Sequence, residues 1–155
     1  MYMVIDDICY NYSLGYEIPP DTKTLYYIYE NRYKPYISLP DILPECLQRL
    51  ICHESNLTSI PNLPSGLIIV NCNYNKLTEL PPIPLKLISL QCNHNNIIEL
   101  PELPYGLEIL DCSHNPIKYI SQENYNVFIK IERLCWANLT ISHTPVYEEY
   151  FNKTI

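Results

Sequence analysis

Cysteine and histidine are the residue types in this chain best suited to metal binding or nucleophilic chemistry. Four of the seven cysteines recur at intervals of 20 residues, namely Cys52, Cys72, Cys92 and Cys112. Three of the four histidines, His53, His94 and His114, follow members of this cysteine column by one or two positions. Thiolate and imidazole groups are common zinc ligands, and a paired Cys and His can form a nucleophile.

The spacing argues against a zinc site. Zinc sites usually take two ligands that lie only a few residues apart, as in C-x2-C. Cysteines that are 20 residues apart and occupy apolar slots point into a core, while the histidines lie on or beside the opposite face. We therefore predict buried thiols and no cofactor. The remaining metal candidate is the pair His94 and His114.

Covalent chemistry of the cysteines is also disfavoured. Neighbouring members of the column could approach disulfide distance, but thiols in a reducing compartment stay reduced. Cys9, Cys46 and Cys135 lie outside the column, and none has an evident histidine partner. The sequence contains no glycine-rich phosphate loop. We therefore predict that the chain is not an enzyme.

A 20-residue repeat must position all these side chains. Its four copies run from Leu43 to Gln122 and read LPECLQRLICHESNLTSIPN, LPSGLIIVNCNYNKLTELPP, IPLKLISLQCNHNNIIELPE and LPYGLEILDCSHNPIKYISQ. Within each copy, apolar unit positions 8 and 10 alternate with variable positions 7, 9 and 11. This alternation indicates a short strand with one buried face. A strict period predicts a stack of like coils, in which the strands pair in parallel.

The remainder of each unit predicts how the coil closes. The period leaves no room for a long helix, so the return path must be extended. The recurring prolines, from Pro61 to Pro104, suit a polyproline-II conformation on the convex side, and this architecture also explains their PxxP spacing. A polar residue follows each cysteine by three positions and predicts a buried hydrogen-bonded ladder beside the cysteine column. These residues are Ser55, Asn75, Asn95 and Asn115.

The unit L-x-x-[LV]-x-C-x-x-[NS]-x-[LI] resembles the regular segment of leucine-rich repeats. The flanking L-P-x-L-P resembles the short 20-residue repeat class of bacterial effector proteins. The resemblance implies an α/β solenoid class fold with mostly parallel strands, little helix and a right-handed, curved shape, and it implies protein binding. Some effector ubiquitin ligases carry such repeats before a catalytic domain. We expect no such domain in the 33 residues after Gln122.

We expect one domain over residues 1–155. Residues 1–42 are predicted to be degenerate N-terminal capping repeats, in which Leu25 and Ile28 take leucine slots and Glu30 takes the cysteine slot. The alternative for this segment is a short helical cap built on Tyr26, Tyr27 and Tyr29.

Residues 123–142 are predicted to be a C-terminal cap, and residues 143–155 a tail. Leu134, Ala137 and Leu139 fit a last worn repeat, whereas Val127, Ile131 and Leu134 also fit helical spacing. We expect a cap of mixed character, with Trp136 covering the last core layer.

Composition limits the partners and the location of the protein. The chain is 47% hydrophobic and 17% charged, which excludes general disorder. Its net charge of −7 disfavours nucleic acid and anionic membrane partners. The start MYMVIDDICY lacks the basic residues and long apolar run of a classical signal peptide, so we expect a cytoplasmic protein. The repeat style also resembles short repeat proteins of large amoebal DNA viruses, which implies the cytoplasm of a host cell.

The candidate binding surface is the exposed face of the strands, which is the concave face of such a solenoid. Its predicted contact residues are Arg49, Ile51, His53, Ile69, Asn71, Asn73, Tyr74, Ser89, Gln91, Asn93, Ile109, Asp111 and His114. Amides on a rigid scaffold suit hydrogen bonding to a protein or peptide. The alternatives are a structural protein that assembles through its exposed ends, and a remnant of a ubiquitin-ligase recognition domain.

Overall fold

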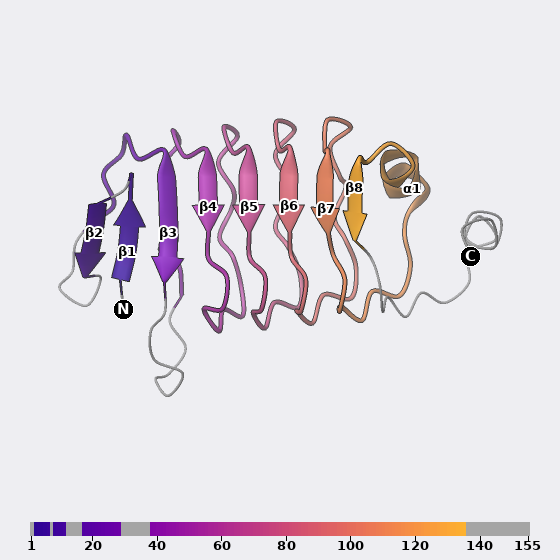
Figure 1. Ribbon diagram of the computed structural model, residues 1–155, viewed down its shortest axis with the longest axis horizontal. Coiled ribbons are helices and arrows are strands. Elements are labelled where there is room, and N and C mark those ends of the chain that lie inside the picture. Colours follow the sequence, from indigo (N-terminus) through magenta and orange to yellow (C-terminus); the bar gives the residue numbers. More distant parts are fainter. Residues whose placement is uncertain (1, 7, 12–16, 29–37, 136–155) are drawn as a thin grey trace.

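In the computed structural model, the chain forms one mixed sheet with a short helix at its C-terminal end (Figure 1). The structure describes residues 2–6, 8–11, 17–28 and 38–135. Within these ranges the elements are β1 (Tyr2–Ile5), β2 (Ile8–Asn11), β3 (Thr24–Ile28), β4 (Arg49–Ile51), β5 (Ile69–Asn71), β6 (Ser89–Gln91), β7 (Ile109–Asp111), α1 (Gln122–Phe128) and β8 (Arg133–Cys135). The strand order is β2-β1-β3-β4-β5-β6-β7-β8.

Strands β4 to β7 are the strands that the repeat predicts. They pair in parallel, and each residue lies opposite the residue at the same unit position in the next coil. Leu50, Val70, Leu90 and Leu110, at the centres of these strands, are buried. The predicted fold class is therefore confirmed: the chain is a β-solenoid with mostly parallel strands and little helix.

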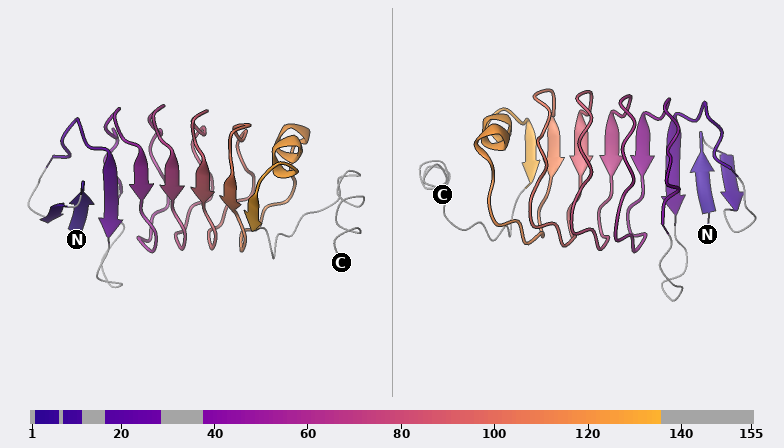
Figure 2. Two further views of the ribbon diagram at one scale, coloured as in Figure 1. Left: turned by 45° about the horizontal axis from the view of Figure 1, so that its top comes forward. Right: turned by 180° about the vertical axis from the view of Figure 1, so that it is seen from behind.

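The return segments form a second layer behind the sheet (Figure 2). They contain neither helix nor strand between β4 and β7. Each ends in a tight four-residue turn that leads into the next strand. In the turn before β5, the Leu67 amide donates to the Pro64 carbonyl at 3.1 Å, and the equivalent bonds before β6 and β7 measure 3.0 Å. The L-P-x-x-L pattern thus sets the point at which each strand begins.

The core lies between these two layers as one continuous apolar strip. The leucine-type slots of successive coils stack on one another, and most of their side chains are fully buried. Burial of one such side chain contributes about 1.5–3 kcal/mol. The cysteine column lies in this strip, where all four side chains are 0% exposed: Cys52, Cys72, Cys92 and Cys112.

Buried asparagines close each coil just after its strand. The Asn75 side-chain amide donates to the Cys52 and Cys72 carbonyls at 2.8 and 2.9 Å, and its Oδ1 accepts from the Leu57 amide at 3.0 Å. The same bonds recur one coil and two coils further on, from Asn95 and Asn115. Each amide therefore links two neighbouring coils through their backbones.

The register predicted for the N-terminal repeat is wrong. Leu25 pairs with Leu50, so Tyr27 takes the slot equivalent to Cys52, and Glu30 does not. A turn sets this register, because the Thr22 amide donates to the Pro19 carbonyl at 3.1 Å, as in the later L-P-x-x-L turns.

Tyr27 fits the cysteine slot because its polar end finds a partner. The side chain is 1% exposed, and its hydroxyl donates to the Ser38 carbonyl at 3.1 Å. Ser55, which opens the asparagine column, donates to the Tyr27 carbonyl at 3.0 Å. The helical alternative for this segment is wrong as well, because residues 24–28 form β3. Tyr29 lies outside the described residues.

A β-hairpin precedes β3 in place of a first repeat. β1 pairs antiparallel with both β2 and β3, whereas every pair from β3 to β8 is parallel. Its turn contains Asp6, whose φ of 44° is left-handed. The described residues among 1–42 therefore contribute one repeat-like strand and a hairpin beside it.

Asp6 completes the hydrogen bonding of the first coil. In the next coil, the amides of Gln48 and Arg49 donate to the Lys23 carbonyl of the coil before. β3 has no such preceding coil, and the Asp6 carboxylate accepts instead from the amides of Lys23 at 3.2 Å and Thr24 at 2.7 Å.

Asp6→Ala is expected to lower the free energy of unfolding by about 1–3 kcal/mol, because two backbone amides lose their charged acceptor. Urea unfolding followed by circular dichroism measures the change. Asp41→Ala is the matched control, since Asp41 is also exposed and should tolerate the change within about 0.5 kcal/mol. Equal losses in the two variants would show that the carboxylate does not cap the stack.

Helix α1 and strand β8 close the other end, so the cap combines a helix with a repeat-like strand. The helical spacing predicted for Val127, Ile131 and Leu134 is wrong, because α1 ends at Phe128 and Leu134 lies in β8. The register predicted for the last repeat is wrong as well, because Leu134 pairs with Leu110 and so takes the slot that the pattern assigned to Ala137. Val127 and Phe128 of α1 are buried against the core, and Leu134 of β8 pairs with Leu110. Ser121 is the N-cap, whose side chain accepts from the Asn124 amide at 3.1 Å. Trp136, Ala137, Leu139 and residues 143–155 lie outside the described residues.

Asn124 ties α1 to the last regular coil. Its side chain is 2% exposed, and its Oδ1 accepts from the Leu103 amide at 2.8 Å. Its Nδ2 donates to the Pro101 carbonyl at 2.9 Å. In the described part of the chain, no helix has the length and apolar character that a membrane-spanning segment needs.

Candidate interaction face

The outward residues of β4 to β7 line up in rows across the sheet. At unit position 9, Ile51, Asn71, Gln91 and Asp111 are all partly exposed. At position 7, Arg49 is exposed, and Ile69 and Ile109 are partly exposed. Ser89 is only 5% exposed, because it lies between the larger Ile69 and Ile109 on the neighbouring strands. The structure therefore places this predicted contact residue below the surface.

Hydrogen bonds hold the amides of this face in position. Gln91 Oε1 accepts from the side-chain amides of Asn71 and Asn73, both at 3.4 Å. Asn71 Oδ1 accepts from the Asn73 backbone amide at 3.2 Å, and Asn73 Oδ1 accepts from the Asn93 backbone amide at 2.9 Å. The predicted contact residues of two adjacent coils thus form one fixed network.

Asp111 ends this network at the C-terminal side. Its carboxylate accepts from Asn93 Nδ2 at 2.5 Å and from the Ser113 hydroxyl at 2.7 Å. It also accepts from the Ser113 backbone amide. One coil earlier, the equivalent amide, that of Asn93, donates to Asn73 Oδ1, so the Ser113 amide would by analogy donate to Asn93 Oδ1. Asn93 Oδ1 is left buried without a hydrogen-bond partner. Asn93, a predicted contact residue, is 9% exposed and acts here mainly by holding Asp111.

Three aromatic rings stack along the rim at unit position 12. The centroids of Tyr74 and His94 are 4.3 Å apart and those of His94 and His114 are 4.0 Å apart, each with an interplanar angle of 11°. These spacings are slightly shorter than the 4.8 Å between parallel strands. The 20-residue period places the three residues at one unit position, but it does not by itself predict that their rings stack.

The rim residues share a left-handed backbone that L-amino acids seldom adopt. Their φ angles are 52° at Glu54, 55° at Tyr74, 52° at His94 and 54° at His114. Each such residue costs about 1–2 kcal/mol relative to an ordinary conformation. Because four consecutive coils repeat the conformation, it belongs to the coil geometry, and it aims the position-12 side chains along one edge.

The stacked geometry disfavours a metal between His94 and His114. The lone pairs of an imidazole lie in the ring plane, and two nearly parallel rings whose centroids are 4.0 Å apart do not direct them at one point. No cluster of three or more ligating side chains occurs in the part of the chain that the structure describes.

Burial keeps the cysteine column protonated. Desolvation raises the pKa of Cys72 and Cys112 from an ordinary value of 9.0 to about 12. It also raises the pKa of Cys52 and Cys92 well above 9.0. A thiol must lose its proton to act as a nucleophile or a metal ligand. Cys46 and Cys135 are exposed, and Cys135 continues the position-9 row beside Asp111.

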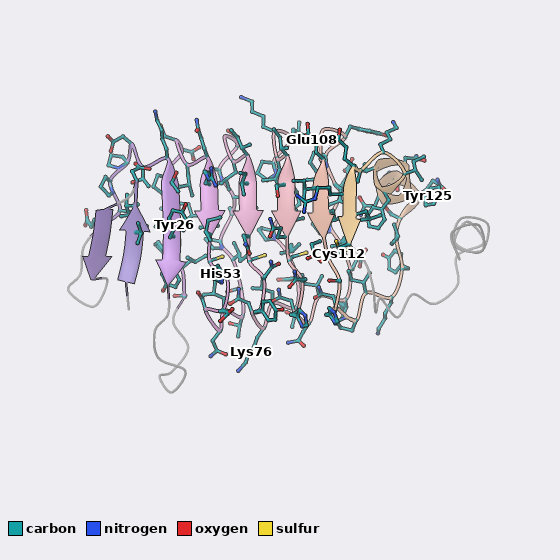
Figure 3. The ribbon with its side chains drawn as sticks, in the orientation of Figure 1. Tyr26, His53, Lys76, Glu108, Cys112 and Tyr125 are labelled. Carbon is teal, nitrogen blue, oxygen red and sulfur yellow. The ribbon has the colours of Figure 1, made fainter. Side chains whose placement is uncertain are left out.

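A row of isoleucines borders the amides on the side where the strands begin. Ile68 is partly exposed and Ile88 is 38% exposed, and both are at unit position 6. Ile69 and Ile109 are at the neighbouring position 7. Figure 3 shows Glu108 at this upper edge and His53 at the lower ends of the strands. Unit position 6 is not among the predicted contact positions, although its variation between coils was a usable signal. The exposed face of the strands thus changes from apolar through amide to aromatic.

The parallel coils, leucine slots and asparagine column define the class of this fold as a leucine-rich-repeat solenoid. Among solved structures, the LRR domain of a Shigella effector is similar, with 33% identity and a TM-score of 0.63 over 70% of this chain. YopM from Yersinia enterocolitica is similar as well, with 27% identity and a TM-score of 0.55, also over 70% of this chain.

The matched region is a part of each of these larger proteins. The chain spans 47% of the Shigella structure and 28% of YopM. No protein-family model matches the sequence, and no curated protein matches it. The comparisons therefore establish the fold class of this chain. They do not transfer the activities of the two larger proteins to it.

Proposed function

We propose that the chain is a non-catalytic protein-interaction module whose concave face binds a protein or peptide. One observation carries this proposal. The buried positions 8, 10 and 13 hold nearly the same residue in every coil, whereas the face positions 7, 9, 11 and 12 differ from coil to coil in an equivalent backbone setting. A face that served only to complete the coil would not need this variety.

The chemistry of the face suits a polypeptide ligand. Gln91 and Asn71 are partly exposed and can offer further donors and acceptors to a peptide backbone. The isoleucine row can cover apolar side chains of the ligand. Because the amides are already held by hydrogen bonds on short, paired strands, little ordering entropy should be lost on binding. The likeness to an effector LRR domain supports a recognition role of this kind.

The test is a four-residue variant, Asn71→Ala, Tyr74→Ala, Gln91→Ala and Asp111→Ala, used to capture partners from host-cell lysate. We expect the affinity for a captured partner to fall at least about tenfold, which corresponds to about 1.4 kcal/mol. The matched control replaces Thr58, Thr78 and Ile98, which share exposed unit position 16 on the return side. Unchanged partners in the first variant, with circular dichroism showing an intact fold, would reject this surface.

An assembly role is the second candidate, and the ends of the sheet favour it. β2 and β8 are its outermost strands, and neither has a partner on its outer side within the described residues. Unpaired strand edges tend to pair with other chains. This role predicts oligomers that grow with concentration in light scattering and that do not respond to the concave-face variant.

The proposal also includes a cytoplasmic location. The six cysteines whose side chains the structure describes are unpaired, and four of them are fully buried thiols. Unpaired thiols are typical of reducing compartments.

A further inference from the structure

A hollow of about 360 Å³ lies at the edge of the solenoid where the return segments turn into β6 and β7. These turns are at the upper ends of the two strands in Figure 1. Three prolines, Pro82, Pro101 and Pro104, line it together with Leu85 and Tyr105. None of these residues belongs to the concave face, so the hollow is a separate surface.

Two exposed apolar side chains form its walls. Leu85 is 87% exposed and Tyr105 is 69% exposed, so neither contributes much to the core. The same unit position holds Glu45 and Ser65 in the first two coils, where both are exposed. The turn therefore accepts polar residues, and the change to apolar residues is confined to the two coils that border the hollow.

The hollow is held in shape before any ligand arrives. Proline fixes its own φ angle, so the segments that contain Pro101 and Pro104 lose little freedom on binding. The turn that carries Tyr105 is closed by a 3.0 Å bond from the Leu107 amide to the Pro104 carbonyl. Lys130, which follows α1, places its Nζ 5.1 Å from the centroid of the Tyr105 ring and so restricts that ring.

Glu102 gives the hollow its charge. Its carboxylate is the acidic group among the lining residues, and Glu102 is exposed. The chain as a whole carries a net charge of −7, which further favours a basic ligand. Lys130 stands over the Tyr105 ring but does not line the hollow.

We propose that this hollow binds a short peptide segment that inserts one apolar side chain between Leu85 and Tyr105 and sets a lysine or arginine against Glu102. The apolar side chain would cover the exposed walls, and the adjacent cation would meet the carboxylate. This binding does not depend on the concave face. It would give the module a second contact with the same partner or with another one.

The probe is the end-capped peptide acetyl-Ala-Leu-Lys-amide, titrated into the full chain labelled with ¹⁵N. We expect saturable amide shifts at Leu85, Glu102 and Tyr105, with a dissociation constant of about 1 mM. The peptides acetyl-Ala-Ala-Lys-amide and acetyl-Ala-Leu-Glu-amide are expected to bind several-fold more weakly, because each lacks one half of the recognised pair. No saturable shifts, or equal binding of all three peptides, would overturn the proposal.

Two variants separate this site from the rest of the molecule. The double variant Leu85→Ser and Tyr105→Ser copies the residue that the chain already has at Ser65, so it should fold normally and lose the binding. Glu102→Gln should remove the preference for lysine over glutamate. The concave-face variant should bind the peptide as the unaltered chain does. Loss of binding in that last variant, or retention in the double serine variant, would contradict the assignment.

Discussion

Replacing Asn95 by alanine is expected to lower the free energy of unfolding by about 3 kcal/mol. The Asn95 side chain is 6% exposed and lies between two coils, where its Nδ2 donates to the Cys72 and Cys92 carbonyls, both at 3.0 Å. Its Oδ1 accepts from the Leu77 amide at 3.0 Å. Each carbonyl keeps a second donor from a neighbouring asparagine, but the Leu77 amide loses its acceptor.

The expected loss therefore has two parts. One buried amide is left without an acceptor, which costs about 1–3 kcal/mol, and the bonds to the carbonyls are weakened. Because Asn95 lies in the middle of the stack, the loss also reduces the coupling between the coils on either side.

Asn96→Ala is the matched control for this prediction. Asn96 is the next residue and is exposed, and its backbone amide donates to the Leu77 carbonyl whichever side chain it carries. We expect this control to change stability by less than about 0.5 kcal/mol. Equilibrium urea unfolding of both variants gives the comparison. A loss below about 1 kcal/mol for Asn95→Ala would mean that the column is not a main source of stability.

The four regular coils could be predicted from the sequence because their period imposes one register on all of them. Once Cys72 and Cys92 are placed in equivalent slots, the parallel pairing and the burial of both thiols follow. The N-terminal strand could not be placed in the same way. There Tyr27 replaces a cysteine, and only the turn that ends at Thr22 identifies the register.

The two caps depend on contacts that sequence patterns do not contain. Asp6 accepts from amides that lie 17 and 18 residues further along the chain, and Asn124 bonds a segment more than 20 residues before it. Each is a single polar residue with no periodic counterpart. Nothing in the sequence next to it indicates that its side chain accepts a hydrogen bond from a distant backbone amide.

On the concave face, alternation predicted which residues point outward but not how much of each is exposed. Exposure depends on the size of the neighbour in the next coil, so Ser89 is covered by two isoleucines. Hydrogen bonding depends on the same neighbours, since Asp111 takes the amide that would otherwise bond Asn93. To predict exposure and hydrogen bonding on this face, residues must be compared between neighbouring coils as well as along each strand.

The cysteine column should make the protein unfold in mild alkali. Burial raises the pKa of Cys72 and Cys112 from 9.0 to about 12, so the folded chain keeps these thiols protonated while the unfolded chain ionises them. The stability that this contributes is complete below about pH 9 and is lost as the pH rises towards 12. At about pH 10.5 each of the two thiols should have lowered the free energy of unfolding by about 2 kcal/mol.

The variant Cys72→Ala and Cys112→Ala isolates this effect from the ionisation of tyrosine and lysine, which it leaves unchanged. It should be less stable than the unaltered chain at neutral pH, because it leaves small cavities in the core. Between about pH 8 and pH 10.5, however, it should lose about 4 kcal/mol less, so the two stability curves converge. Urea unfolding under reducing conditions at several pH values measures both curves. Parallel curves would show that the two thiols already ionise in the folded chain, and this would contradict their burial between the sheet and the return segments.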